Sequence, residues 1–380
     1  MKFSAWNIVV LLLPGCGTTI PITQVSNSER GAYEVSLAVD GAGFVAAWYD
    51  TRDGNPEIYM RTVGVSGRPT GPERRLTDDV NLSYEPDIAL VAEDVVIAWY
   101  DQVGERQQAR VGRWGRDGSA RWVRLLGGGT SSRNPLVRVA NGTLFCAWLE
   151  VDEDGGVAVW SQWLDASGNP MTTAERLAPA GETTWNLNAV VDEAETWLVF
   201  DANVGTLREE LFLLRLSGQR RDLLRLTDDD GFASKYPDLV FAENQVAVTW
   251  LDERDGNSEV YLLMASREKL SRGGRVESLR ITQTLGEAIG AYIDWNGGRV
   301  GLAWSDDHEG QHEVYFQTFS PDGTAHASPR RLTDTPSASL IPAIVEWGDG
   351  FALAWNEDVI EERGDHRWGG RSDILFATVR

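Results

Sequence analysis

The sequence predicts an all-β fold, a seven-bladed β-propeller made of four-stranded antiparallel sheets. Three observations support this prediction. A block of about 51 residues recurs seven times along the chain. Each block holds four short runs rich in β-branched and aromatic residues, and no stretch keeps a helical period. A four-stranded repeat of this length is typical of a propeller blade.

The repeat is clearest in an apolar run that ends in a carboxylate. The segment AWYDTRDGNPEIY at 47–59 returns as TWLDERDGNSEVY at 249–261. Related runs follow one another at steps of 49 to 54 residues. Their final residues are Asp50, Asp101, Glu150, Asp201, Asp252, Asp306 and Glu357. We therefore predict one propeller domain over residues 16–380.

Within each copy, the four strands are predicted in the same order. The first lies near a proline, as in YEPDIAL at 84–90, and the second is an unbroken apolar run, as in VVIAW at 95–99. The third resembles EVYLLMA at 259–265, and the fourth is short, as in RRLTD at 330–334. An unbroken apolar run indicates a strand covered on both faces. We expect one tryptophan of each second strand to fill the seam between blades: Trp48, Trp99, Trp148, Trp250, Trp304 and Trp355. In copy four, Val199 takes this position.

The seventh copy ends at its third strand, DILFATV at 373–379. A missing outer strand would leave an unpaired edge. The segment IPITQV at 20–25 has the pattern of a fourth strand, such as LRITQ at 279–283. We therefore predict that the N-terminal segment completes the last blade and closes the ring.

Residues 1–15 are predicted to be a signal peptide. Lys2 precedes an apolar stretch that is too short to span a bilayer as a helix. The sequence LPGC at 13–16 resembles the lipobox of bacterial lipoproteins. This resemblance implies cleavage before Cys16, a lipid on that residue and anchorage at a membrane of the bacterial cell envelope, on its periplasmic or surface-facing side. The alternative is an ordinary signal peptide with an incidental cysteine, and the other cysteine, Cys146, is predicted to lie in the core.

Charge narrows the range of partners. The formal net charge is −22 and the pI is about 4.6. Such a surface repels nucleic-acid phosphates, so we exclude nucleic acid as a partner. The acidic residues are spread along the chain, which favours a well-solvated surface, and we expect a monomer.

The stretch TRDGNPEIYMRTVGVSGRPTGPERRLTDDVNLSYEPDIA at 51–89 resembles the TolB-type propeller repeat. The likeness is close in copies one and five and partial in copy six. This chain departs from that family in its longer repeat and in lacking the Trp-Ser-Pro-Asp-Gly stretch. The resemblance implies a scaffold that binds a partner in the periplasm and does not indicate which partner.

The seven carboxylates that end the second strands are predicted to be structural. They recur in every copy, whereas a catalytic group is usually needed once. Each can accept hydrogen bonds from the following turn or pair with an arginine such as Arg52 or Arg254. Calcium binding through these oxygens is the alternative, and we otherwise expect no cofactor. His308 and His312 lie in a turn before a strand, where a four-residue spacing does not indicate a metal site.

Candidate binding residues lie where the innermost strands begin, because this position varies among the copies. If it borders the central channel, aromatic and cationic side chains gather on one side and could hold a sugar or an acidic peptide. These residues are Tyr33, Tyr84, Arg133, Trp185 and Lys235, with Ile289 and Leu340 in the same register. The long turn of copy seven adds candidates for a contact loop, which are Arg363, His366, Arg367 and Trp368.

No catalytic residues are identified from the sequence. It lacks the Ser-x-Asp-x-Gly-x-Thr-Trp boxes common in sialidases, the Gly-x-Ser-x-Gly elbow and phosphate-binding loops. A pair of glycosidase carboxylates cannot be picked from 57 acidic residues. We therefore expect a lipid-anchored envelope module that binds protein or glycan. The alternatives are a polysaccharide-active hydrolase or lyase and a purely structural envelope component.

Overall fold

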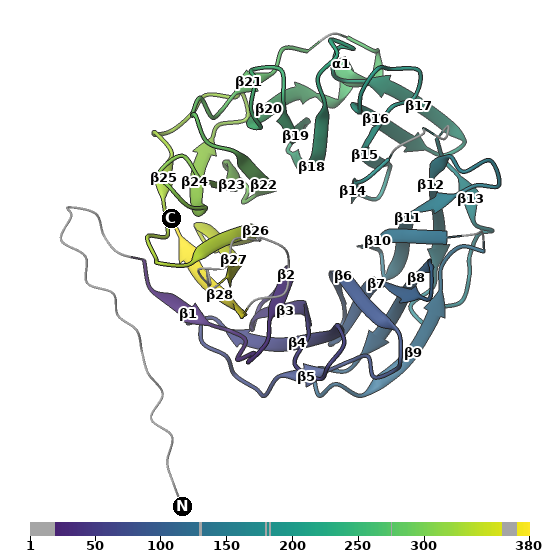
Figure 1. The fold of residues 1–380 in the computed structure, drawn as a ribbon. Coiled ribbons are helices and arrows are strands. Elements are labelled where there is room, and N and C mark those ends of the chain that lie inside the picture. Colours follow the sequence, from purple (N-terminus) through teal and green to yellow (C-terminus); the bar gives the residue numbers. More distant parts are fainter. Residues whose placement is uncertain (1–19, 129–130, 179–180, 182–183, 275, 359–370) are drawn as a thin grey trace, which may run out of the picture.

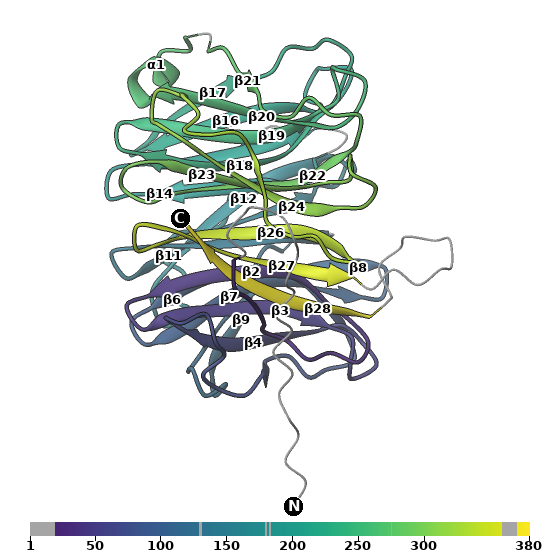
Figure 2. The ribbon, with the colours of Figure 1, turned by 90° about the vertical axis from the view of Figure 1, so that its left-hand side faces the viewer.

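The computed structural model describes residues 20–128, 131–178, 181, 184–274, 276–358 and 371–380. These residues form seven four-stranded antiparallel sheets arranged in a ring around a central channel (Figure 1). Figure 2 shows the strands running from one face of the ring to the other. The predicted seven-bladed β-propeller is confirmed.

The seven blades use the same strand order, from the channel outward. The innermost strands are β2 (Ala32–Asp40), β6 (Leu82–Val91), β10 (Ser131–Ala140), β14 (Leu187–Val191), β18 (Ser234–Ala242), β22 (Ala288–Trp295) and β26 (Ala338–Trp347). The second strands are β3 (Gly43–Asp50), β7 (Asp94–Val103), β11 (Thr143–Val151), β15 (Thr196–Ala202), β19 (Gln245–Asp252), β23 (Val300–Asp306) and β27 (Gly350–Asp358).

The outer half of each blade completes the sheet. The third strands are β4 (Glu57–Gly64), β8 (Arg106–Trp114), β12 (Val157–Leu164), β16 (Glu210–Ser217), β20 (Glu259–Ser266), β24 (Glu313–Phe319) and β28 (Ser372–Val379). The outermost strands are β5 (Arg74–Arg75), β9 (Ala120–Leu125), β13 (Glu175–Arg176), β17 (Arg220–Arg225), β21 (Leu279–Arg280), β25 (Arg330–Arg331) and β1 (Ile22–Gln24). A five-residue helix that the sequence did not predict, α1 (Arg267–Ser271), connects β20 to β21.

The core lies in the seams between neighbouring blades. Every residue of β3 is buried, as the unbroken apolar run predicts. Seven hydrophobic clusters each join two adjacent blades. All six predicted seam tryptophans are buried within these clusters. Each blade is thus held by its neighbours on both sides, which makes the closure of the ring important.

The fourth blade departs from the predicted register by one residue. Phe200 pairs with Phe212 and stacks on it at a centroid distance of 5.7 Å, as Trp48 does with Tyr59 at 6.2 Å. The seam position that we predicted for Val199 is therefore occupied by Phe200. Successive residues of a strand face opposite sides, so the slip turns Val199 toward the fifth blade instead.

The N-terminal segment closes the ring, as predicted. Strand β1 pairs antiparallel with β28, with Ile22 opposite Ala377 (Figure 1). The Val25 N–H then donates to the Ile374 carbonyl oxygen at 2.7 Å. The predicted signal peptide and Cys16 lie outside the described residues. Within the described part of the chain, no helix is long and apolar enough to cross a membrane.

Candidate functional site

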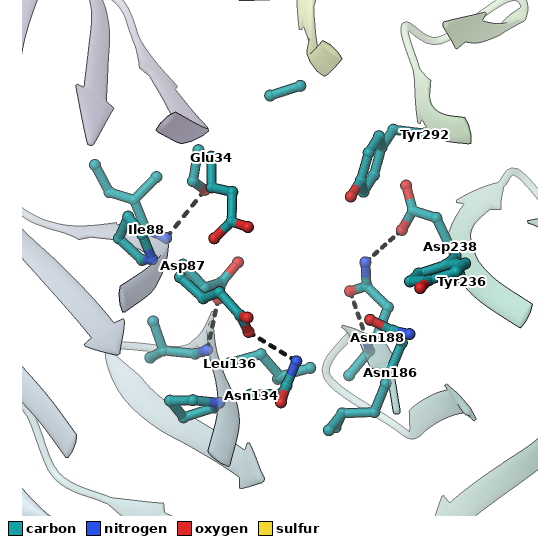
Figure 3. A pocket seen from close by; sticks show the side chains of 18 of the residues that line it. Glu34, Asp87, Ile88, Asn134, Leu136, Asn186, Asn188, Tyr236, Asp238 and Tyr292 are labelled. Atoms are coloured by element: carbon teal, nitrogen blue, oxygen red, sulfur yellow. Dashed lines mark hydrogen bonds between the residues drawn. The ribbon is translucent and has the colours of Figure 1, made fainter. Parts of the chain in front are cut away.

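The central channel holds a cavity of about 1000 Å³. Its walls are formed by the seven innermost strands, so every blade contributes side chains to it. Figure 3 shows Glu34 on one side of this cavity and Tyr236, Asp238 and Tyr292 on the opposite side. A concave site of this volume, with a few polar groups directed into it, is the usual form of a ligand pocket.

A β-bulge repeated around the ring directs side chains into the cavity. It interrupts the pairing of the first and second strands in six blades. One bulge residue per blade has a left-handed backbone: Glu34, Glu85, Asn134, Tyr236, Gly290 and Ile341, with φ between 45° and 59°. A non-glycine residue in this conformation costs about 1 kcal/mol, and a bulge re-aims its side chain. The backbone is therefore constant while the side chain presented to the cavity differs from blade to blade.

Apart from Trp185, whose blade has no such bulge, the predicted binding residues precede these bulge residues by one position. Some of them line the cavity and others do not. Tyr33 is buried behind the cavity wall at 2% exposure, and Tyr84 lies half-buried beside it. Arg133 and Trp185 do line the cavity. Lys235 turns away to an ion pair with Glu253 at 3.0 Å.

Of the remaining candidates, Ile289 lines the cavity and Leu340 is half-buried in β26. The candidate contact loop with Arg363, His366, Arg367 and Trp368 lies outside the described residues.

Arg133 and Trp185 form an aromatic platform at the mouth of the cavity. The guanidinium carbon of Arg133 lies 5.1 Å from the centre of the Trp185 ring, and its Nη2 donates to the Thr184 carbonyl oxygen at 3.0 Å. Trp185 is nevertheless 47% exposed. A cation stacked on one face holds the indole in place, and the exposed part of the ring is free to contact a ligand.

Glu34 and Glu85 occupy the same bulge position in adjacent blades, which brings two carboxyl groups together. The Nδ2 group of Asn134 donates to Glu85 Oε2 at 2.7 Å, and the Tyr100 hydroxyl lies 3.4 Å from Glu85 Oε1. Glu34 Oε2 is buried and has no hydrogen-bond partner among the described residues. Both residues were missed in the sequence analysis. Glu85 directly precedes Pro86, and Glu34 directly precedes the matching position of its own repeat.

The pKa values of this pair are raised to different extents. Burial, followed by the negative charge of Glu85, raises the pKa of Glu34 well above its ordinary value. Burial also raises the pKa of Glu85, but the hydrogen bond from Tyr100 and the charge of Arg133 oppose this and leave it at about 7. As pH rises, Glu85 therefore loses its proton first, near pH 7, while Glu34 keeps its own.

Four tyrosine rings behind the pair provide its poorly solvated surroundings. Tyr33 and Tyr49 lie 5.4 Å apart, Tyr49 and Tyr84 5.2 Å, and Tyr84 and Tyr100 5.7 Å between ring centres. Burial, and then the nearby glutamate charges, raise the pKa of Tyr49 and Tyr100 well above the ordinary value. These two tyrosines therefore stay neutral and keep their hydroxyl protons at physiological pH.

Farther along the channel, a belt of polar side chains ties neighbouring blades together. Arg138 donates to Asp87 at 2.7 Å and to the Asn188 side-chain oxygen at 2.6 Å. Asn188 in turn donates to Asp238 (Figure 3). Asp238 also accepts the Ile293 N–H at 2.9 Å. Asp87 and Asp238 are thus engaged by neighbouring blades, whereas Glu34 Oε2, nearer the mouth, has no hydrogen-bond partner among the described residues.

The raised pKa values predict that the fold loses stability as pH rises toward neutrality. The folded protein keeps the Glu85 proton up to about pH 7, whereas an unfolded glutamate loses it near 4.5. The folded state therefore binds more protons between these values, and the free energy of unfolding falls as pH rises through them. Asp294, with a pKa raised by burial to about 7, acts in the same direction.

Urea unfolding at about pH 5 and about pH 8 should show this loss of stability, and Glu85→Gln should reduce it. Equal pH dependence in the wild type and the variant would contradict the assignment.

The predicted turn carboxylates are held by contacts within the fold. All of them except Glu357 are buried. Five accept a hydrogen bond of 2.7 to 3.1 Å from the tryptophan two residues earlier, in the pairs Trp48–Asp50, Trp99–Asp101, Trp148–Glu150, Trp250–Asp252 and Trp355–Glu357. Asp306 accepts the His308 backbone N–H at 2.9 Å. Across the described ranges, no group of three or more His, Cys, Asp or Glu side chains could hold a metal ion.

Asp201 is placed differently from the other six carboxylates. Ala202 pairs with Glu210 as Asp50 pairs with Glu57, so the turn position of the fourth blade holds an alanine. Asp201 instead accepts backbone N–H groups at the cavity mouth, from Trp185 at 2.8 Å and from Tyr236 at 3.1 Å. The prediction that Asp201 is equivalent to the other six carboxylates is therefore wrong. The reason is the same one-residue slip of the strand that displaced Val199 from the seam.

Comparisons with known proteins show the fold and no family. No protein-family model and no curated protein matches the chain. The polysaccharide lyase Uly1 is similar in structure, with a TM-score of 0.57 and 9% identity over 98% of this chain and 94% of that one. The phage phi92 endosialidase has a TM-score of 0.55 and 10% identity over 94% and 68% of the two chains.

A third similar structure is the β-propeller domain of the Trilobed protease from Pyrococcus furiosus. Its TM-score is 0.53, with 7% identity over 86% of this chain and 91% of that one. That domain is described as having an open velcro topology, whereas β1 closes the ring here. The resemblance to the TolB-type repeat stays a prediction.

Proposed function

We propose that this protein is a glycan-binding propeller of the bacterial cell envelope, anchored by a lipid on Cys16. The observation that carries the proposal is the exposed Trp185 ring, held by Arg133, at the mouth of a cavity lined with hydrogen-bonding groups. Aromatic rings with one exposed face stack on the apolar faces of sugars. Carboxyl and amide groups such as those of Glu85 and Asn134 can then exchange hydrogen bonds with the sugar hydroxyls.

The charges around the cavity favour a neutral glycan over an acidic ligand. The carboxyl groups that line it are those of Glu34, Glu85, Asp87, Asp238 and Asp294, and the guanidinium groups are those of Arg133 and Arg138. Arg138 is paired with Asp87, and Arg133 donates to the Thr184 carbonyl oxygen, so carboxyl groups outnumber the guanidinium groups. The net negative charge of the cavity would therefore repel a uronic acid or an acidic peptide, whereas it would not repel a neutral sugar.

The strand order supports an orientation in which the cavity mouth faces away from the membrane. Third strands start at the mouth, and Ile22 pairs with Ala377, near the far end of β28 (Ser372–Val379). The described chain therefore begins at the face opposite the mouth. A lipid on Cys16 would be only four residues from Ile20. We propose that this short tether holds the opposite face against the membrane.

Replacing the platform tryptophan should weaken glycan binding. Stacking on an aromatic ring contributes about 1 kcal/mol beyond its buried area, so with the lost contact area we expect Trp185→Ala to raise the dissociation constant about tenfold or more. The measurement is calorimetric titration of the lipid-free protein with soluble laminarin, mannan, xylan and chitin oligosaccharides. Trp122→Ala, in β9 on the outer circumference, is the matched control and should leave the affinity unchanged.

Two results would contradict the proposal. One is the absence of binding to every probe of that panel. The other is binding that Trp122→Ala weakens as much as Trp185→Ala does, because this would place the ligand away from the cavity.

A further inference from the structure

We propose that Glu34 and Glu85 are a catalytic pair that hydrolyses a glycosidic bond of the bound neutral glycan. In this proposal Glu34 donates the proton and Glu85 activates the water. It rests on the proposed glycan-binding function and adds a reaction to it.

The first support is position. Both carboxyl groups are presented by the same bulge in neighbouring blades, Glu34 in β2 and Glu85 in β6, and both line the mouth of the cavity. The platform of Arg133 and Trp185 comes from the next two blades. A sugar stacked on Trp185 would therefore extend along one side of the mouth toward the pair.

The second support is the absence of a structural task for Glu34. The other acidic side chains of the cavity wall are engaged: Asp87 accepts from Arg138, Asp238 accepts from Asn188, and Asp294 accepts backbone N–H groups. Glu34 Oε2 is buried and lacks a hydrogen-bond partner in the described part of the chain. An unpaired buried carboxyl oxygen costs stability, and a ligand hydroxyl or glycosidic oxygen would supply its missing partner.

The surroundings give the two carboxyl groups different roles. Glu85 receives the hydrogen bond from Asn134 and lies near the charge of Arg133, and both stabilise its ionised form. Glu34 has no such donor among the described residues, and burial, followed by the charge of Glu85, favours its protonated form. Glycoside hydrolysis by two carboxyl groups requires one that is protonated and one that is ionised, and the different pKa values of Glu34 and Glu85 meet this requirement.

The reaction consumes one water molecule. Glu34 transfers its proton to the glycosidic oxygen while the bond between that oxygen and the anomeric carbon breaks. Water adds to the anomeric carbon and gives a proton to Glu85. The proton then returns from Glu85 to Glu34 through solvent, so the net change is one glycoside plus water to two free hydroxyl groups. Cleavage by β-elimination requires a carboxylate on the sugar. A neutral glycan lacks this group, so hydrolysis is the cleavage reaction that fits it.

The experiment measures reducing ends released at about pH 7 from each neutral probe that the wild type binds, with polygalacturonate as an anionic comparison. General acid or base catalysis contributes roughly 100-fold or more. We therefore expect Glu34→Gln and Glu85→Gln each to lower the rate at least that much while binding changes little. Glu93→Gln, an exposed residue in the turn between β6 and β7, should keep the wild-type rate. Melting curves of the three variants check that they fold.

Each outcome decides between the two proposals. If both glutamine variants still bind the probe but no longer release reducing ends from it, the catalytic pair is supported. A probe that binds but stays intact refutes the pair and leaves the proposed function standing. Cleavage that survives either glutamine substitution, or that yields an unsaturated sugar from polygalacturonate, also refutes it. A wild type that binds no probe refutes both proposals.

Discussion

Removing residues 1–30 should destabilise the entire ring. The deletion takes away β1 and the hydrogen bonds that follow it. These include Ser26 Oγ to Asp373 at 3.0 Å, Ser28 Oγ to Asp50 at 2.9 Å and Arg61 Nη1 to the Val25 carbonyl at 2.6 Å. Besides the β1–β28 pairing, residues 25–28 make eight hydrogen bonds to the rest of the chain. At roughly 1 kcal/mol each, their loss gives about 8 kcal/mol. We expect the melting temperature to fall by roughly 10 °C.

The matched control is a protein that starts at Ile20, which keeps β1 and should melt like a protein that starts at Cys16. Ser26→Ala is an intermediate case, because its hydroxyl donates to Asp373 and accepts the Ile374 N–H at 2.7 Å. It should cost about 2 kcal/mol. If the 1–30 deletion melts at the same temperature as the Ile20 protein, the closure contributes nothing.

Trp48→Ala should destabilise the ring more than the loss of any single hydrogen bond at the closure. The Trp48 side chain is fully buried in the seam between blades seven and one, and its Nε1 donates to Asp50 at 3.1 Å. Truncating a buried tryptophan leaves a cavity and costs about 3–5 kcal/mol. The buried Asp50 would also lose a donor. Urea denaturation measures the free energy of unfolding.

Trp185→Ala provides the comparison, since this side chain is 47% exposed and lies at the cavity mouth. It should change the free energy of unfolding by less than about 1 kcal/mol. Equal losses for the two variants would mean that the seams do not carry the stability of the ring.

The sequence predicted the architecture because blades repeat. Seven apolar runs such as VVIAW set the number of blades, and the missing outer strand after DILFATV indicated closure by the N-terminal segment. Register in the fourth blade was harder. Asp201 kept the spacing of the other carboxylates, yet the strand is shifted by one residue, and spacing alone cannot distinguish the two faces of a strand that is buried on both.

The cavity was predicted only in part, because a bulge decides which residue faces it. Counting along the innermost strand selected Tyr33 and Tyr84, whereas the bulges turn the following residues, Glu34 and Glu85, inward. The usable signal was the residue directly before the recurrent proline, as in Glu85–Pro86. Such a residue is normally extended, so its left-handed backbone became visible only in the structure.

The most direct test of the central claim is a crystal structure of the protein that starts at Ile20 with the oligosaccharide that binds it most tightly in the titrations. The claim predicts a sugar ring stacked on Trp185, with hydroxyl groups hydrogen-bonded to Asn134 and Glu85 at the mouth of the channel. A sugar bound on the outer strands or at the opposite face would contradict it, and so would an empty cavity at a concentration that saturates binding in solution.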